Sequence, residues 1–236
     1  MNKCQEKKVS DKQLPDDIQF VWHGVNDETN LTRFLKSDIE WGEIDARLCI
    51  DKEIVITRNA SFEVIPFEID SDFLSLDNVL KQIKTKDKSA KIDLKENGIL
   101  LEKLLDILDD IPFEEDQLWF TGNIEQVTSE GFQLLSETYP DAIIQCTGNF
   151  LLPMILEFPV MADDVLSQFK EWGINRLSID WTKKAGLVEA LQWLSEWGMD
   201  FNIYNVPDLK ELHQAITLNP VAITSDFDFP EWNDLR

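Results

Sequence analysis

The chain is poor in basic residues and contains no long run of apolar residues. Its 236 residues include 22 Lys and Arg against 45 Asp and Glu, which gives a formal net charge of −23. Nucleic acids and anionic membrane surfaces both require clustered positive charge on a protein, so this composition argues against either as a partner. No apolar stretch approaches the roughly 18 residues of a membrane-spanning helix, and we expect no transmembrane segment.

Cysteine is also scarce. The three cysteines, Cys4, Cys49 and Cys146, lie far apart, without metal-ligand spacing and without a readable disulfide framework. We therefore expect reduced thiols in a cytoplasmic protein, although a chain that had lost an export signal would look the same. A Gly-x-Gly-x-x-Gly motif is missing as well, so nothing indicates a dinucleotide site.

Short apolar or β-branched runs alternate with amphipathic stretches along most of the chain. Residues 1–17 are polar and predict an N-terminal arm, and residues 18–236 predict one domain. The eight predicted strands are Phe20–His23, Gly42–Leu48, Ala90–Leu94, Leu118–Gly122, Ala142–Cys146, Arg176–Asp180, Phe201–Tyr204 and Val221–Thr224. The predicted helices are Glu28–Lys36, Leu76–Lys84, Leu100–Leu108, Ser129–Tyr139, Ala162–Trp172, Leu187–Trp197 and Asp208–Ile216.

Eight strands that alternate with helices predict an α/β fold, a single (βα)8 TIM barrel. An open, doubly wound sheet is the alternative. Two helices end in Trp-Gly, with Gly173 and Gly198 at positions that favour a left-handed cap, which is typical of repeated βα units. The segment Asp51–Asp72 is longer than an ordinary βα loop, and its portion Glu53–Thr57 predicts a small hairpin inserted after the second strand.

Charged residues alternate with apolar ones on two of the predicted strands. Glu43, Asp45 and Arg47 share one face of the second strand, while Asp93 and Lys95 share one face of the third. The apolar faces pack under helices, so the charged faces point into the barrel. With His23 at the end of the first strand, these residues converge on one mouth of the barrel.

Three carboxylates and water suit a hard divalent cation, Mg²⁺ or Ca²⁺, and Glu43, Asp45 and Asp93 are the candidate metal ligands. Lys95 and His23 are the candidate catalytic residues, because a lysine can hold an anionic oxygen and a histidine can move a proton. The alternative is a structural cluster in which the acids are paired with Arg47, Lys91 and Lys95 and no metal binds.

The segments His23–Asn26, Glu43–Asp45 and Asp93–Lys95, in that order, resemble the phosphatidylinositol-phospholipase-C-like phosphodiesterase superfamily. This superfamily includes the glycerophosphodiester phosphodiesterases and spider-venom sphingomyelinase D. Within it the chain is most similar to the menorin family, on the pattern Trp22, His23, Asn26, Glu43, Asp45, Lys91–Lys95 and Trp119–Asn123. The resemblance implies a TIM barrel, a divalent metal on Glu43, Asp45 and Asp93, an acid/base or nucleophilic His23, and a phosphodiester substrate of the glycerophosphodiester or phospholipid type.

The sequence departs from this family at two positions. Related phosphodiesterases carry a second histidine where Asn59 stands, and an aspartate of menorin-like proteins is replaced by Asn123. Asparagine can bind a phosphate oxygen but cannot shuttle a proton near neutral pH. The only other histidine, His213, falls in a predicted helix. A catalytically impaired pseudoenzyme or a binding module of the same fold is therefore the alternative to an active hydrolase.

The remaining candidates are substrate-binding residues. Asn26 and Asn59 offer amides, and Arg58 can hold a phosphate with two hydrogen bonds or be an ordinary surface residue of the hairpin. Three further candidates are aromatic residues near strand ends, which can attract a choline-like group or simply belong to the core: Trp119, Trp181 and Tyr204.

Overall fold

We analysed a computed structural model of the chain. The structure describes residues 15–48, 54–56, 74–96, 98–182 and 186–227. Most of the predicted N-terminal arm lies outside these ranges, as do Arg58 and Asn59. Within them, no helix is both long and apolar enough to cross a membrane.

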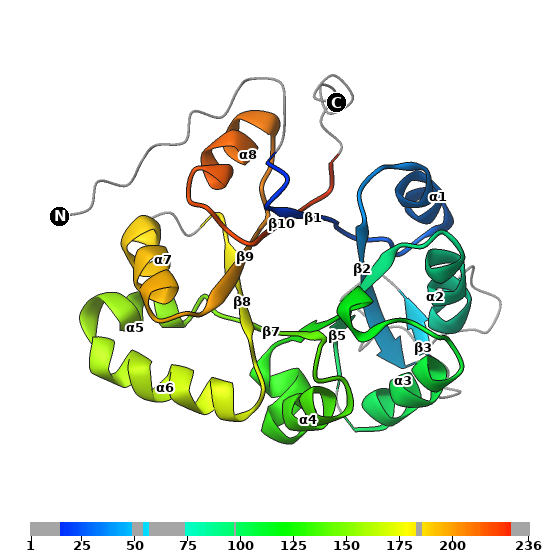
Figure 1. The fold of residues 1–236 in the computed structure, drawn as a ribbon, viewed down its shortest axis with the longest axis horizontal. Helices are drawn as coiled ribbons and strands as arrows, with labels where there is room; N and C mark the ends of the chain where they lie inside the picture. Colours follow the sequence, from blue (N-terminus) through cyan, green and yellow to red (C-terminus); the bar gives the residue numbers. More distant parts are fainter. Residues whose placement is uncertain (1–14, 49–53, 57–73, 97, 183–185, 228–236) are drawn as a thin grey trace, which may run out of the picture.

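Eight parallel strands close into a barrel, which confirms the predicted (βα)8 fold (Figure 1). Each barrel strand pairs with the barrel strand that follows it in the chain, beginning with the first and second. The last strand pairs with the first, and this pairing closes the ring. The barrel strands are β1 (Gln19–Trp22), β2 (Trp41–Leu48), β5 (Ser89–Leu94), β6 (Leu118–Gly122), β7 (Ile143–Thr147), β8 (Arg176–Asp180), β9 (Asp200–Tyr204) and β10 (Ala222–Ser225).

Strand alternation separates an apolar outer face from a largely polar interior. Ile44, Ile92 and Phe120 are fully buried among the residues that pack against the helices. Inside the barrel a small apolar cluster consists of Val21, Trp41, Trp119 and Ala222. The next interior positions toward the carboxyl ends of the strands are polar, so the barrel interior itself is built to hold polar groups.

The helices surround the barrel in a ring (Figure 1). They are α1 (Glu28–Lys36), α2 (Leu76–Thr85), α3 (Ile99–Asp109), α4 (Ile124–Thr138), α5 (Leu151–Glu157), α6 (Pro159–Glu171), α7 (Leu187–Glu196) and α8 (Leu209–Ile216). Three N-caps accept a backbone hydrogen bond on their side chains, as helix starts require: Asp27, Asn123 and Asp208. The predicted glycine C-caps are confirmed, since φ is +79° at Gly173 and +71° at Gly198.

One helical prediction needs correction, and one helix was not predicted. The helix α4 begins at Ile124 and not at Ser129, because Asn123 caps it and a kink with φ of +61° at Thr128 joins two helical pieces. The helix α5 was not predicted, because Pro153 interrupts its short sequence. Pro153 is tolerated there because it lies in the first turn, where the backbone N–H has no helical partner.

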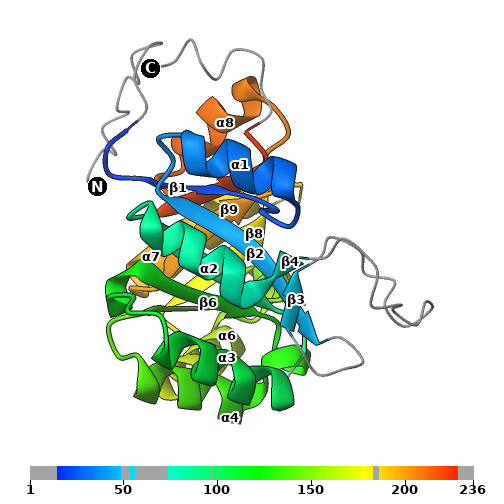
Figure 2. The ribbon, with the colours of Figure 1, turned by 90° about the vertical axis from the view of Figure 1, so that its right-hand side faces the viewer.

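The predicted hairpin insertion is confirmed for the part of it that the structure describes. Strand β3 (Ile54–Ile56) runs antiparallel to the end of β2, and β4 (Leu74–Ser75) pairs with β3. In the side view of Figure 2 both lie at the end toward which the β2 arrow points. The insertion therefore branches from the end of the barrel that carries the candidate residues.

Candidate active site

A cavity of about 630 Å³ opens at the carboxyl ends of the barrel strands. This is the face on which βα loops carry the chemistry in proteins of this fold. Six of the sequence-predicted site residues line it together, namely His23, Glu43, Asp45, Asp93, Lys95 and Tyr204. Its size falls within the range of ordinary small-molecule sites.

Three carboxylates from two adjacent strands meet at the centre of this cavity. Asp45 of β2 lies in register with Asp93 of β5, and Glu43 precedes Asp45 by two residues on the same face. One oxygen from each carboxylate lies within 4.8 Å of the others. Burial is the largest influence on Asp93, and with the charges of Glu43 and Asp45 it raises the pKa of Asp93 to about 6 despite the nearby Lys95.

Two lysines of β5 and its extension neutralise part of this charge. Lys91 Nζ lies 2.7 Å from Glu43 Oε2, and Lys95 Nζ lies 3.1 Å from Asp45 Oδ1 and also bonds to Asp93. Burial raises the pKa of Glu43, but the charges of Lys91 and His23 outweigh it, so the net pKa is lowered. Arg47, an alternative partner in the sequence, instead faces Glu96, with 4.0 Å between Nη1 and Oε1.

His23 is held by an aspartate from the opposite end of the chain. Its Nδ1 lies 2.7 Å from Asp226 Oδ1, and its Nε2 lies 3.8 Å from Glu43 Oε1. Burial lowers the pKa of His23, but the hydrogen bond with Asp226 and the charges of Glu43, Asp226 and Asp45 raise it further, so the net pKa is above the ordinary value. Asp226 directly follows β10, and the closure of the barrel brings it to β1. Sequence reasoning did not find it.

The three carboxylates fit a hard divalent cation in donor type and in spacing. Oxygen is the ligand atom that Mg²⁺ and Ca²⁺ prefer, and closely spaced buried carboxylates repel one another unless a cation or a proton is present. Asn26 supports this set, because its Nδ2 donates to Asp45 Oδ2 at 3.0 Å and its Oδ1 accepts from the Asp45 backbone N–H at 2.9 Å. Asn26 is therefore placed beside a candidate ligand and orients it.

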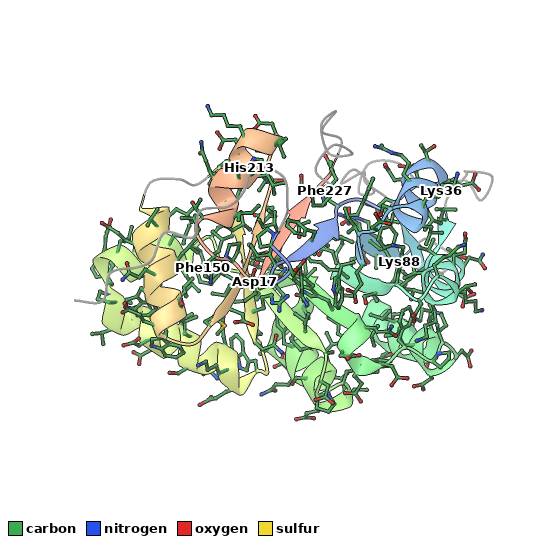
Figure 3. The ribbon with its side chains drawn as sticks, turned by 45° about the horizontal axis from the view of Figure 1, so that its top comes forward. Asp17, Lys36, Lys88, Phe150, His213 and Phe227 are labelled. Carbon is green, nitrogen blue, oxygen red and sulfur yellow. The ribbon has the colours of Figure 1, made fainter. Side chains whose placement is uncertain are left out.

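The structure does not bring all the aromatic candidates to the cavity. Tyr204 lines it, and its hydroxyl accepts a hydrogen bond from Asn149 Nδ2 at 2.7 Å. Trp119 belongs to the buried apolar cluster inside the barrel, and Trp181 is buried and donates to Glu211 Oε2. Neither tryptophan is among the cavity-lining residues. The other histidine, His213, lies on α8 in the outer ring (Figure 3).

Comparisons with known proteins show likeness in structure alone. A scan against protein-family models finds no match, and neither does a search of curated sequences. Among solved structures, a glycerophosphodiester phosphodiesterase from Parabacteroides distasonis is 14% identical with a TM-score of 0.67, covering 90% of this chain and 94% of that one. The corresponding enzyme from Thermotoga maritima is 16% identical with a TM-score of 0.62, covering 89% and 94%.

A third structure was solved with a product bound. It is an Oleispira antarctica phosphodiesterase in complex with sn-glycerol-3-phosphate, 13% identical, with a TM-score of 0.66 and coverage of 89% of this chain and 93% of that one. These likenesses show that the chain shares the fold of these phosphodiesterases. The finer likeness to the menorin family stays a prediction.

Proposed function

We propose that the protein is a metal-dependent hydrolase of phosphodiesters of the glycerophosphodiester or phospholipid type. The observation that carries this proposal is that His23, the carboxylates of Glu43, Asp45 and Asp93, and Lys95 meet in a single cavity at the carboxyl ends of the barrel strands. The fold is shared with glycerophosphodiester phosphodiesterases, which supports the proposal. A lone acidic cluster would not carry it, because structural ion pairs also occur in barrels.

Glu43, Asp45 and Asp93 would hold the metal, with Mg²⁺ or Ca²⁺ as the candidates. When bound, such an ion supplies positive charge that stabilises phosphate oxygens during reaction. Lys95 lies beside two of these acids and keeps its own charge, because burial lowers its pKa but Asp93 and Asp45 raise it further. Its ammonium can therefore contact a phosphate oxygen at the same place.

His23 is the residue that moves the proton. Its Nδ1 is engaged by Asp226, which leaves Nε2 on the side of Glu43 and the cavity. In the neutral form of His23, Nε2 can take a proton from an attacking water molecule as the new P–O bond forms. It can then return that proton to the alcohol oxygen as the old P–O bond breaks. Asp226 acts as a positioning residue, since it fixes the ring and stabilises the imidazolium that forms when Nε2 takes the proton.

The test is hydrolysis of a panel of phosphodiesters in the presence of Mg²⁺ or Ca²⁺. We expect turnover by the wild type and a large loss of turnover in His23→Ala. The control is His213→Ala, which removes the second of the two histidines in the sequence, on the outer helix α8, and should leave turnover unchanged. Equal turnover in the wild type and His23→Ala would exclude His23 from the mechanism. Glu43→Gln is expected to lose activity together with metal binding.

A second candidate function is a binding module that has lost turnover. It is favoured by the presence of only two histidines in the chain and by Asn59 at the family position of the second one. The variant Asn59→His separates the two candidates. Activity that appears only in that variant supports the binding module, whereas activity in the wild type excludes it.

A further inference from the structure

The chain turns directly after the residue that holds His23. The ladder between β10 and β1 ends at the pair of Ser225 and Trp22, and one further backbone bond runs from the His23 N–H to the Ser225 carbonyl at 2.8 Å. Asp226 lies beyond this paired stretch, so the sheet by itself does not fix its carboxylate. At Phe227 the backbone adopts a φ of +47°, a left-handed conformation that is rare for a bulky residue.

The Phe227 side chain is anchored on β1. It is 3% exposed, and its ring centre lies 6.1 Å from that of Phe20, edge to face, and 6.2 Å from that of Trp22, in a tilted arrangement (Figure 3). Trp22 is covered in turn by Arg33 of α1, whose guanidinium carbon lies 5.3 Å from the ring centre. A strained backbone persists only where its surroundings enforce it, and these aromatic contacts do so here.

Asp226 and Phe227 contact opposite faces of the same strand end. Trp22 and Phe227 belong to the apolar core outside the barrel, whereas His23, the next residue after Trp22, lines the cavity. On that inner side Asp226 Oδ1 lies 2.7 Å from His23 Nδ1. The two consecutive residues therefore clasp the end of β1, and displacement of the Phe227 ring would displace the adjoining carboxylate.

The contact with Asp226 decides which ring nitrogen of His23 carries the hydrogen in the neutral form. A carboxylate only accepts hydrogen bonds, so Nδ1 must donate to it. Nε2, which lies 3.8 Å from Glu43 Oε1, is then the basic nitrogen on the cavity side. Without a fixed carboxylate both tautomers are open to the imidazole, and the tautomer with its hydrogen on Nε2 cannot accept a proton there.

We propose that Phe227 is a positioning residue, whose ring on the outer face of β1 holds the Asp226 carboxylate against Nδ1 and so keeps Nε2 of His23 free to accept a proton in the cavity. The inference rests on the proposed function for the catalytic role of His23. Phe227 does not line the cavity, so its effect passes through Asp226 and not through contact with a substrate.

The first measurement is ¹⁵N NMR of the full chain at a pH above the titration of His23, where the shifts of the two ring nitrogens report the tautomer. We expect the hydrogen on Nδ1 in the wild type and a mixture of both tautomers in Phe227→Ala. Phe227→Gly should show the same loss, and it guards against misfolding because glycine adopts positive φ without strain. The matched control is Phe169→Ala, which removes a ring of α6 that is 1% exposed and packs edge to face on Phe150.

The second measurement is a double-mutant cycle on phosphodiester turnover. Phe227→Ala should lower kcat by about 10- to 100-fold, the cost of a small misplacement of a catalytic group. It should leave KM unchanged, because Lys95 and the candidate metal ligands are not altered. Added to Asp226→Ala, it should lower kcat no further, whereas a merely structural role would add a second loss.

Retention of the Nδ1 tautomer in Phe227→Ala or Phe227→Gly would overturn the inference. An equal change of tautomer in Phe169→Ala, or an additive loss in the double variant, would overturn it as well. If the wild type hydrolyses no phosphodiester, the proposed function fails, and the ¹⁵N measurement still decides whether Phe227 positions the imidazole.

Discussion

Replacing Lys91 by Met should destabilise the protein far more than replacing an exposed lysine. The Lys91 and Glu43 side chains are 3% and 10% exposed, and Lys91 Nζ also contacts Thr224 and lies 4.5 Å from the centre of the Trp119 ring. Methionine keeps most of the volume but leaves the Glu43 carboxylate buried without its cation. Breaking a buried pair in this way costs about 3–5 kcal/mol.

The assay is urea unfolding with linear extrapolation, carried out with a chelator present so that no divalent ion compensates. The matched control is Lys81→Met, which removes the exposed pair between Lys81 and Asp77, where the side chains are 54% and 38% exposed. That pair should contribute only about 0.3–0.5 kcal/mol. If the two variants lose the same free energy of unfolding, the description of the buried pair is wrong. Excess Mg²⁺ should restore part of the loss in Lys91→Met, because the ion returns positive charge to Glu43.

Three further predictions follow from single contacts. Mg²⁺ affinity should be roughly tenfold weaker at pH 5 than at pH 7, because Asp93, with a pKa of about 6, is mostly protonated at the lower pH and must lose its proton to bind the ion; a flat calorimetric profile would contradict this. In Asp226→Asn the NMR titration midpoint of His23 should move to lower pH, because the carboxylate that raises its pKa is gone, while the His213 signals serve as internal control. Gly42→Ala should cost about 1–3 kcal/mol in thermal unfolding, since the added Cβ would lie 2.6 Å from Phe34 Cε1; an unchanged melting temperature would show that Phe34 moves freely.

The barrel could be predicted from the sequence because its signals are local. The alternation of apolar residues predicted the bounds of each barrel strand to within about one residue. Gly173 and Gly198 predicted the turns at the ends of two helices. Alternation also predicted that Glu43, Asp45 and Asp93 face inward together, since parallel neighbours in register share a face. The helix α5 was not predicted, because its seven-residue segment contains a proline and has neither a clear apolar periodicity nor a capping side chain.

The rest of the site depends on contacts that are distant in the chain. Asp226 and His23 are separated by 203 residues, and only closure of the ring between β1 and β10 brings them together. Gln145 and Asn202 are buried amides that line the cavity from inward positions on β7 and β9, so the alternation that identified the acids could have identified them as well. The lack of a hydrogen-bond partner for Gln145 Oε1 and Asn202 Nδ2 among the described residues, however, can be recognised only when the partners of every neighbouring polar group are known.

The proposed function depends most on whether the three carboxylates of β2 and β5 hold one divalent cation. The most direct measurement is anomalous diffraction from a crystal soaked in Mn²⁺, which binds the same hard oxygen ligands as Mg²⁺. We predict one strong peak within bonding distance of Glu43, Asp45 and Asp93. A cavity without a peak, in which Lys95 still bridges Asp45 and Asp93, would contradict the claim and leave the acids as a structural ion-pair cluster.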